Sequence, residues 1–264
     1  MIVRAIKSPK VAPDQYALLS LLDQILPELR DGSVLAITSK IVSLCENGVV
    51  PIDTVAKEEL IKQEADRYLL LPDNKYGLTF TVTNHTLIVN AGVDESNVEG
   101  DYYLLWPANP QQTANEVRAY LRQRFKLQNV GVVITDSTAR PLRWGMGGMA
   151  IARSGFAALH DYRGEADLYG RRFRMETGDI SGGLAASAVL VMGEGAEQTP
   201  LAVLEDLPFV QFQDRDPRAA ELKALAISLE DDLYGPILTS VAWQEGGHGS
   251  TTRGPADASS ASHS

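Results

Sequence analysis

A short apolar run rich in β-branched residues constrains the fold of this chain more than any other stretch. The run from Val130 to Ile134 (VGVVI) is typical of a strand buried inside a sheet. A helical pattern precedes it, from Thr113 to about Leu127, and Thr113 and Glu116 have the spacing of a capping box. A segment near Leu104, this helix and the buried run together predict a β-α-β unit.

The remaining apolar patterns predict both strands and helices. Hairpin strands are expected on either side of Asn84-His85, because two residues that accept a tight turn separate two β-branched runs. The other expected strands are Ile2–Ile6, Ser33–Thr38 and Leu201–Leu204, and the other expected helices are 14–30, Lys57–Leu70, Gly182–Val191 and Ala219–Leu233. The predicted fold class is therefore mixed α/β (α+β), with mixed sheets and flanking helices.

Length and composition describe a folded protein with a substantial core. The chain has 264 residues, of which 44% are hydrophobic and 22% charged. No shift in composition marks a boundary, so residues 1–245 are expected to form one domain. Residues 246–264 contain almost no apolar side chains and are expected to form a disordered C-terminal tail.

The charge balance and the cysteine count exclude several classes of partner. A net charge of −10 disfavours binding to nucleic acid and to anionic membranes. No apolar run approaches the ~20 residues that span a bilayer, and the N-terminus lacks the apolar core of a signal peptide, so a cytoplasmic location is expected. The only cysteine, Cys45, cannot form an internal disulfide, and its apolar surroundings suggest packing rather than catalysis.

Oxygen-bearing side chains follow the buried run. Asp136, Ser137 and Thr138 stand in a row, and Arg140, Arg143 and a glycine cluster come next. Residues 140–174 hold seven arginines against three acidic residues, a local charge of +4 in an acidic chain. This pattern favours a hard cation or a small anionic ligand; the alternative is a strand end, a glycine turn and a solvated arginine face.

Three further segments carry polar groups beside predicted strands and helices. Ser39 and Lys40 leave a buried strand and are suited to a phosphate, or they form a helix cap and a surface lysine. Asp94 with Asn97 suits a metal- or ribose-binding loop, or an ordinary turn. The glycine-rich Met192–Pro200 loop carries two glutamates, which suit a second cation or only solvent.

Five motifs in order resemble one family, the GTP-dependent coenzyme F-420 gamma-glutamyl ligases with their folate-associated relatives. The motifs are Ser39–Gly48 (SKIVSLCENG), Asn90–Val98 (NAGVDESNV), Val133–Arg143 (VITDSTARPLR), Asp161–Arg171 (DYRGEADLYGR) and Met192–Pro200 (MGEGAEQTP). The resemblance spans most of residues 2–245. It implies an intertwined homodimer with a mixed α/β fold.

The activity that this resemblance implies is amide-bond formation. The enzyme would join the amine of L-glutamate to a carboxylate acceptor, a coenzyme F-420 precursor or a folate, through a gamma-glutamyl bond. A nucleotide, GTP or alternatively ATP, would activate the acceptor as an acyl phosphate. Two divalent cations, Mg²⁺ or Mn²⁺, would hold the nucleotide, and K⁺ is a further candidate ion.

The resemblance also implies roles for individual residues. Asp94 and Asp136 would bind one cation, and Ser137 and Glu194 the other. Asp136, Arg140 and Arg143 are the candidate catalytic residues. The residues expected to line the nucleotide are Ser39, Lys40, Asn97, Met192, Gly193, Glu194, Gly195, Ala196, Glu197, Gln198 and Thr199.

Two departures from the family pattern keep other readings open. Leu44 occupies the position of a phosphate-contacting lysine of the deazaflavin ligases, which leaves Lys40 as its substitute. An N-terminal Gly-x-Pro motif reads Lys7-Ser8-Pro9. These departures favour membership of the folate-associated branch of the family. They also admit an alternative function, a nucleotide- and metal-binding regulator without turnover.

Overall fold

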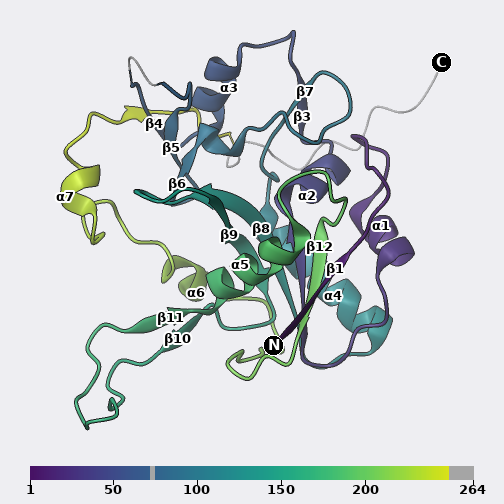
Figure 1. Ribbon diagram of the computed structural model, residues 1–264, viewed down its shortest axis with the longest axis vertical. Helices are drawn as coiled ribbons and strands as arrows, with labels where there is room; N and C mark the ends of the chain where they lie inside the picture. Colours follow the sequence, from purple (N-terminus) through teal and green to yellow (C-terminus); the bar gives the residue numbers. More distant parts are fainter. Residues whose placement is uncertain (72–74, 250–264) are drawn as a thin grey trace. The chain divides into compact units, whose positions relative to one another are not determined.

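Four of the expected strands and one that was not predicted, β9, form one mixed sheet in the computed structural model, which describes residues 1–71 and 75–249 (Figure 1). In spatial order its strands are β1 (Ile2–Ile6), β12 (Leu201–Glu205), β2 (Ser33–Thr38), β8 (Val130–Ala139) and β9 (Met146–Ser154). Only β2 and β8 are parallel; the other neighbours are antiparallel. The predicted mixed α/β fold class is confirmed.

The chain divides into two compact units. Unit 1 comprises Met1–Asn47 and Asn109–Ala226, and unit 2 comprises Gly48–Ala108 and the chain from Ile227 on. The predicted β-α-β unit is wrong, because β7 (Tyr102–Leu104) pairs with β3 (Val49–Pro51) inside unit 2. The parallel partner of β8 is instead β2, so all of Gly48–Ala108 is inserted into the connection between two neighbouring strands.

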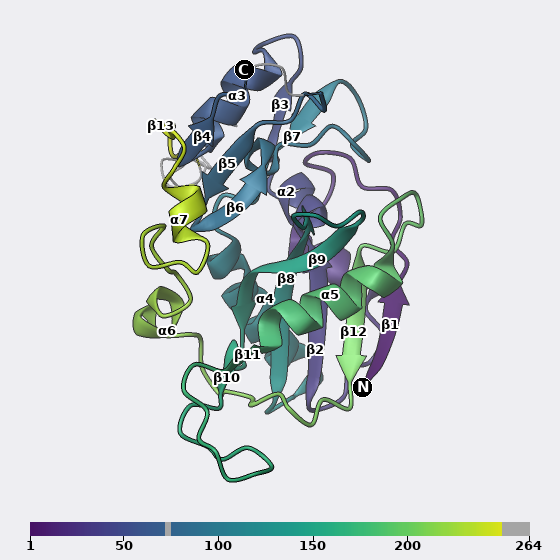
Figure 2. The ribbon, with the colours of Figure 1, turned by 60° about the vertical axis from the view of Figure 1, so that its left-hand side comes forward.

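Helix α5 (Ile180–Met192) covers one face of the unit 1 sheet, and α4 (Pro110–Phe125) lies on the other (Figure 2). Small residues of α5, including Ala185 and Ala188, are buried in one cluster with Val34 and Val133 of the sheet. Helices α1 (Leu18–Ile25) and α2 (Ser39–Cys45) complete the α4 side. The predicted helix Gly182–Val191 is confirmed as part of α5.

The ends of two helices differ from the prediction for local reasons. Helix α1 stops at Ile25 because Leu26 precedes a proline and takes an extended conformation (φ −73°, ψ 127°). Helix α4 begins with Pro110 at its first position, and the Asn109 side chain caps it by accepting from Gln112 N at 3.1 Å. Thr113 therefore lies inside the helix, and the predicted capping box is wrong.

Unit 2 contains a four-stranded sheet in the order β13 (Gln244–Glu245), β4 (Arg67–Leu69), β5 (Phe80–Thr83) and β6 (Thr86–Val89). The predicted hairpin around Asn84-His85 is confirmed. Both turn residues are left-handed, with φ of 49° and 58°, as a two-residue type I′ connection requires.

Helix α3 (Lys57–Glu64) is shorter than the expected Lys57–Leu70, which is wrong beyond Glu64. Arg67–Leu69 joins the sheet instead, between β5 and β13. Backbone N–H groups of Gly246, Gly247 and His248 donate to carbonyls at the end of α3 and just beyond it, at 2.9–3.0 Å. The start of the predicted tail thus contacts unit 2, and its residues 250–264 lie outside the described residues.

The predicted helix Ala219–Leu233 is wrong. The segment contains only α6 (Ala219–Lys223), and α7 (Gly235–Leu238) follows it. Helix α6 buries none of its residues, so no packed apolar face supports a longer helix. In the part of the chain that the structure describes, no helix has the length and hydropathy needed to cross a membrane.

Candidate active site

Three segments of unit 1 meet at one edge of the five-stranded sheet. Strand β2 ends at Thr38, opposite Thr135, where its parallel pairing with β8 also ends. Strand β12 begins at Leu201 opposite Ile37, and Thr38 N donates to the Pro200 carbonyl at 3.0 Å. The loop before β12 is therefore tied to the carboxyl ends of two neighbouring parallel strands, the place where open α/β sheets bind ligands.

Ser137 of β8 contacts Glu194 of this loop. The Ser137 hydroxyl is 2.9 Å from Oε1 and 2.7 Å from Oε2 of the Glu194 carboxylate. The structure thus brings together the two residues expected to share one cation. A hydroxyl and a carboxylate are hard oxygen donors of the kind that Mg²⁺ and Mn²⁺ prefer. Their part in metal binding stays a prediction.

The loop that carries Glu194 is fixed by its own side chains. Helix α5 ends at Met192 and is followed by Gly193, whose φ of 83° few other residues adopt. The Glu197 carboxylate accepts from Gly195 N at 2.8 Å, and the Thr199 hydroxyl donates to the Met192 carbonyl at 2.5 Å. Glu197 therefore shapes the loop, and Glu194 is the acidic residue of the loop that faces β8.

Asp136 lies inside a strand rather than after one. The expected strand end near Ile134 is wrong, because β8 continues to Ala139 by pairing with β9. Ser137 pairs with Gly148, which lies against Ala185 of α5, so Ser137 faces the α5 side. Side chains alternate along a strand, which places Asp136 on the opposite side, the one covered by α2 and α4.

The first residues of α2 stand on that same side. Ser39 is buried, and Lys40 is half-buried, directly after the end of β2. The half-buried Asp136 comes one residue after the last parallel pair of β2 and β8. Ser39, Lys40 and Asp136 therefore all lie where the parallel pairing of β2 and β8 ends. Their contacts with a nucleotide stay predictions.

The two candidate arginines belong to the loop that joins β8 and β9. Arg140 and Arg143 are exposed, and Arg140 Nη2 lies 3.4 Å from the position that a side chain on Gly147 would take. Leu142 in the same loop has a left-handed φ of 59° and is fully exposed. A bulky residue in this conformation marks a strained loop tip.

Asp94 and Asn97 belong to unit 2. The Asp94 carboxylate accepts from the backbone N–H groups of Glu95 at 2.6 Å and Ser96 at 2.9 Å, and from the Ser96 hydroxyl at 3.1 Å. An ordinary turn was the alternative interpretation of Asp94 and Asn97, and these bonds show that such a turn is present. Asn97 is exposed with a left-handed φ of 57°. Their roles toward a cation and a nucleotide stay predictions.

The backbone before Asp94 is unusual. Asn90, Ala91 and Gly92 are three successive left-handed residues, with φ of 56°, 51° and 76°. The Asn90 side chain accepts from Thr79 N, and the Thr81 hydroxyl accepts from Ala91 N, both at 2.9 Å. These bonds hold a conformation that costs free energy at non-glycine residues, and they fix the direction in which the chain enters the Asp94 turn.

The described residues contain no metal centre made only of acidic, histidine and cysteine side chains. Among residues 1–71 and 75–249, no three or more His, Cys, Asp or Glu residues gather closely enough to hold an ion. Cys45 is poorly suited to act as a nucleophile, because burial, assisted by the nearby Glu46 charge, raises the pKa of its thiol to about 11.

Arg153 is a deeply buried charged residue that was not among the sequence candidates. Arg153 stands in β9 and is 4% exposed. Its signal in the sequence is a lone charge in an otherwise apolar strand segment, MAIARS. The cluster of motifs at residues 130–143 drew attention to exposed arginines instead.

Comparisons with known proteins show which family the chain resembles. A model of the family described as F420-0:Gamma-glutamyl ligase matches residues 5–206. Coenzyme F420:L-glutamate ligase of Methanopyrus kandleri is 34% identical over 222 residues, which cover 78% of this chain and 87% of the relative. The proteins of the same name from Methanococcus maripaludis and Methanocaldococcus jannaschii are 36% and 33% identical, over 76% and 71% of this chain and 85% and 82% of the relatives.

Proposed function

The chain belongs to the F420-0:gamma-glutamyl ligase family, and on that basis we propose that it joins L-glutamate to coenzyme F420-0 through a gamma-glutamyl amide bond. It is an enzyme of the ligase class. The observation that best supports the proposal is the meeting of Ser39, Asp136 and the Glu194 loop at the carboxyl ends of β2 and β8. Named relatives favour the coenzyme over folate as the acceptor.

Joining an amine to a carboxylate requires that the carboxylate be activated first. In the proposed reaction an acceptor carboxylate oxygen attacks the terminal phosphorus of GTP, and GDP leaves. The unprotonated amine of glutamate then attacks the carbonyl carbon of the acyl phosphate, inorganic phosphate leaves with the bonding electron pair, and the nitrogen loses a proton. Phosphoryl transfer of this kind depends mainly on positioning and charge neutralisation.

In this proposal, residues of unit 1 supply both the positioning of the substrates and the neutralisation of phosphate charge. Lys40, at the start of α2, contributes a point charge toward the nucleotide phosphates, and Ser39 contributes a hydroxyl beside it. The exposed guanidinium groups of Arg140 and Arg143 are placed to orient a carboxylate of a substrate. The Gly193–Thr199 loop lines the nucleotide with backbone groups held by Glu197 and Thr199.

Divalent cations fit the oxygen donors at this edge. Ser137 and Glu194 would hold one cation, and Asp136 would contribute to another from the opposite face of β8. Bound Mg²⁺ or Mn²⁺ would neutralise phosphate charge during transfer. Asp94, in its turn in unit 2, is the fourth ligand that the family resemblance implies.

A second copy of the chain is the proposed partner. Strands β10 (Leu159–Asp161) and β11 (Thr177–Asp179) form an arm that extends away from the unit 1 sheet in both views (Figures 1 and 2). Near its tip Leu168 is 98% exposed and Tyr169 is 88% exposed. Large apolar side chains presented this way are typical of an interaction surface, and an intertwined homodimer would cover them.

Phosphate release tests the proposed function. Purified protein is incubated with GTP, Mg²⁺ or Mn²⁺, L-glutamate and F420-0, and each component is omitted in turn. We expect release only from the complete mixture. A parallel set with ATP and with a folate identifies the nucleotide and the acceptor. If the protein binds nucleotide but releases phosphate from none of the mixtures, it is a regulator rather than a ligase. Phosphate release without glutamate would indicate a hydrolase.

A further inference from the structure

Trp144, in the loop that joins β8 and β9, differs from the other two tryptophans of the chain. Trp106 is 5% exposed and packs against Gly92. Trp243 is half-buried, and its indole N–H donates to the Leu238 carbonyl at 2.7 Å. Trp144 is 94% exposed. An indole stabilises a structure mainly by removing a large apolar area from water, and within its own chain Trp144 removes almost none.

The loop around Trp144 is not made of the residues that best suit a turn. Leu142 is fully exposed and has a left-handed φ of 59°, a conformation that glycine and asparagine adopt more easily. Leu142 and Trp144 thus place two large apolar side chains in water at the tip of one hairpin. Contact with another molecule explains this choice of residues better than folding does.

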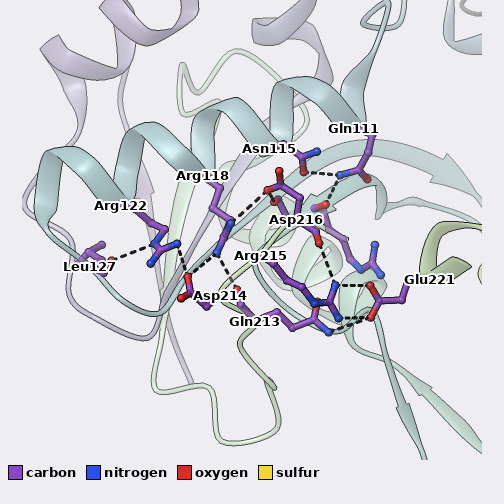
Figure 3. Close-up of polar contacts among 12 residues, drawn as sticks. Gln111, Asn115, Arg118, Arg122, Leu127, Gln213, Asp214, Arg215, Asp216 and Glu221 are labelled. Carbon is purple, nitrogen blue, oxygen red and sulfur yellow. Dashed lines mark hydrogen bonds and ion pairs between the residues drawn. The ribbon is translucent and has the colours of Figure 1, made fainter. Parts of the chain in front are cut away.

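The charges of this loop also lack partners. Several arginines of unit 1 are held by carboxylates, as Figure 3 shows for Arg118, Arg122 and Arg215. In the described part of the chain, no carboxylate forms an ion pair with the exposed Arg140 or Arg143, and residues 137–160 include no acidic residue. Arg153 of β9 also has no ion pair and has two unpartnered nitrogens, but it is 4% exposed and therefore closed to a ligand at the surface. The loop presents two accessible positive charges beside an exposed aromatic ring, which together complement an aromatic anion.

The hairpin tip extends from the sheet edge proposed as the active site. Asp136 pairs with Met149, and the pairing of β8 with β9 ends three positions later, at Ala139. Trp144 lies five positions before Met149 in the chain. At ~3.3 Å per residue, Trp144 is therefore roughly 10–17 Å from Asp136 along the hairpin. A molecule that reacts near Asp136 and also covers Trp144 must be elongated.

The order of the strands indicates which substrate meets the tip. Strands β12, β2, β8 and β9 follow one another in the sheet. The segments expected to line the nucleotide belong to β2 and β12, because one follows β2 and the other precedes β12. The hairpin loop leaves β8 on the opposite side, toward β9. L-Glutamate has no aromatic ring, which leaves the carboxylate acceptor as the substrate for this side.

We propose that Trp144 stacks on a fused aromatic ring of the carboxylate acceptor and thereby contributes to acceptor specificity. The acceptor then consists of a planar ring joined by a flexible chain to a carboxylate roughly 10 Å or more away. Arg140 and Arg143 lie between the two ends and attract its negative charge. Deazaflavin and folate acceptors both have this form. Resting on the ligase function proposed above, the ring is the deazaflavin of F420-0.

Binding of F420-0 tests this role of Trp144. Equilibrium dialysis, with and without GDP and Mg²⁺, gives the Kd, and tryptophan emission follows the same titration. We expect F420-0 to quench the wild-type emission saturably. In Trp144→Ala the Kd should rise tenfold or more, since stacking on one aromatic side chain contributes roughly this much. Trp144→Phe keeps a smaller ring and should give an intermediate Kd.

Leu142→Asn is the matched control. It removes apolar surface from the same tip, and asparagine suits the left-handed conformation. Its Kd for F420-0 should remain near that of the wild type. Because both side chains are exposed, all these variants should keep the wild-type melting temperature. In steady-state assays of Trp144→Ala, the KM for F420-0 should rise, whereas the KM values for GTP and L-glutamate should not.

Several results overturn the inference. These are an equal Kd in wild type and Trp144→Ala, no saturable binding of F420-0 to the wild type, and an equal loss of affinity in Leu142→Asn. A loss of GTP affinity in Trp144→Ala would assign the indole to the nucleotide instead. Light scattering completes the set, because a dimer that dissociates only in Trp144→Ala would make the tip a contact between two copies of the chain.

A parallel titration with folate separates the two acceptors. Trp144-dependent binding of F420-0 but not of folate supports the assignment, and the reverse overturns the deazaflavin. Glutamyl transfer measured on the same preparations separates this inference from the proposed function. Transfer with an unchanged KM for F420-0 in Trp144→Ala overturns the inference alone. Trp144-dependent binding of F420-0 without transfer overturns the ligase function alone.

Discussion

Asp136 concentrates the chemistry of the proposed site in one carboxylate. It is half-buried, and it stands one residue past the last parallel pair of β2 and β8. Asp136→Asn keeps the shape of the side chain and removes one charge. We expect the melting temperature to remain near that of the wild type and turnover to fall roughly a thousandfold or more, since metal stabilisation of a transferring phosphate contributes several kcal/mol.

Asp206→Asn is the matched control for this change. Asp206 is exposed directly after the far end of β12, and asparagine tolerates its left-handed φ of 54°. This variant should keep full activity. An Asp136→Asn protein that is active but less stable would make Asp136 a structural residue and remove it from the catalytic set.

Cys45 should be inert in the folded protein. Its thiol has a pKa of about 11, against about 8.5 for a free thiol, so very little thiolate exists at pH 8. Alkylation by iodoacetamide at pH 8 should be roughly a hundredfold slower than in urea-unfolded protein, and its rate should rise as the pH approaches 11. Because the folded state favours the neutral thiol, stability should decrease as the pH rises above about 8.5. Equal alkylation rates in folded and unfolded protein would contradict the burial of this thiol.

The packing of α5 on β9 depends on a glycine. A side chain on Gly148 would approach the Ala185 carbonyl to 2.5 Å and the Val189 Cβ to 2.8 Å, whereas one on Gly183 of α5 would meet nothing within 4 Å. Gly148→Ala should lower the free energy of unfolding by ~1–3 kcal/mol through overpacking. Gly183→Ala should raise it by ~0.5–1 kcal/mol because alanine favours the helix. Urea unfolding of both variants checks the pair, and a stabilised Gly148→Ala would show that the two elements are not in close contact.

Local sequence signals predict an element well where its cause is local. The hairpin at Asn84-His85 needs two left-handed residues, and the pair of residue types shows it. The helical sequence pattern of α3 extends as far as Leu70, but Arg67–Leu69 pairs with β5 and β13 instead. Because β13 begins at Gln244, this pairing joins residues far apart in the sequence. Helix α6 fails for the opposite reason, because its periodic apolar residues find no surface to cover. Long-range pairing and missing partners are not visible in a window of 15 residues.

The same distinction applies to the candidate site. Motif order identified the segments that meet at the sheet edge, including Ser137 and Glu194, which lie 57 positions apart and are in contact. The alternation that turns Asp136 and Ser137 to opposite faces requires β8 to continue past Ile134, which the apolar run did not indicate. Arg153 was missed because a missing partner is a property of the folded surroundings, not of the sequence.

At the scale of the molecule, the sequence that forms the five-stranded sheet of unit 1 is interrupted by a segment of unit 2. Gly48–Ala108 leaves unit 1 after β2 and α2 and returns before α4, so β2 and β8 pair across 97 positions. Composition does not change at either point, and therefore no boundary was predicted. The last described residues complete unit 2, since β13 pairs with β4.

Two truncations test how far the C-terminal segment contributes to unit 2. Removing residues 250–264 should leave the melting temperature unchanged, because that sequence has almost no apolar side chains. Removing 244–264 also deletes β13 and the three backbone hydrogen bonds to the end of α3, and should lower it by several degrees. Equal effects of the two truncations would show that Gln244–His248 does not stabilise unit 2.

The central claim is that this chain forms a gamma-glutamyl bond by using the sheet edge of unit 1. Mass spectrometry of F420-0 after incubation with GTP, a divalent cation and L-glutamate tests it most directly, with wild type and Asp136→Asn side by side. With the wild type we expect F420-0 to gain the mass of at least one glutamyl residue, in proportion to the phosphate released, and with Asp136→Asn we expect almost no product. An unchanged F420-0 mass while phosphate accumulates, or equal product from both proteins, would contradict the account.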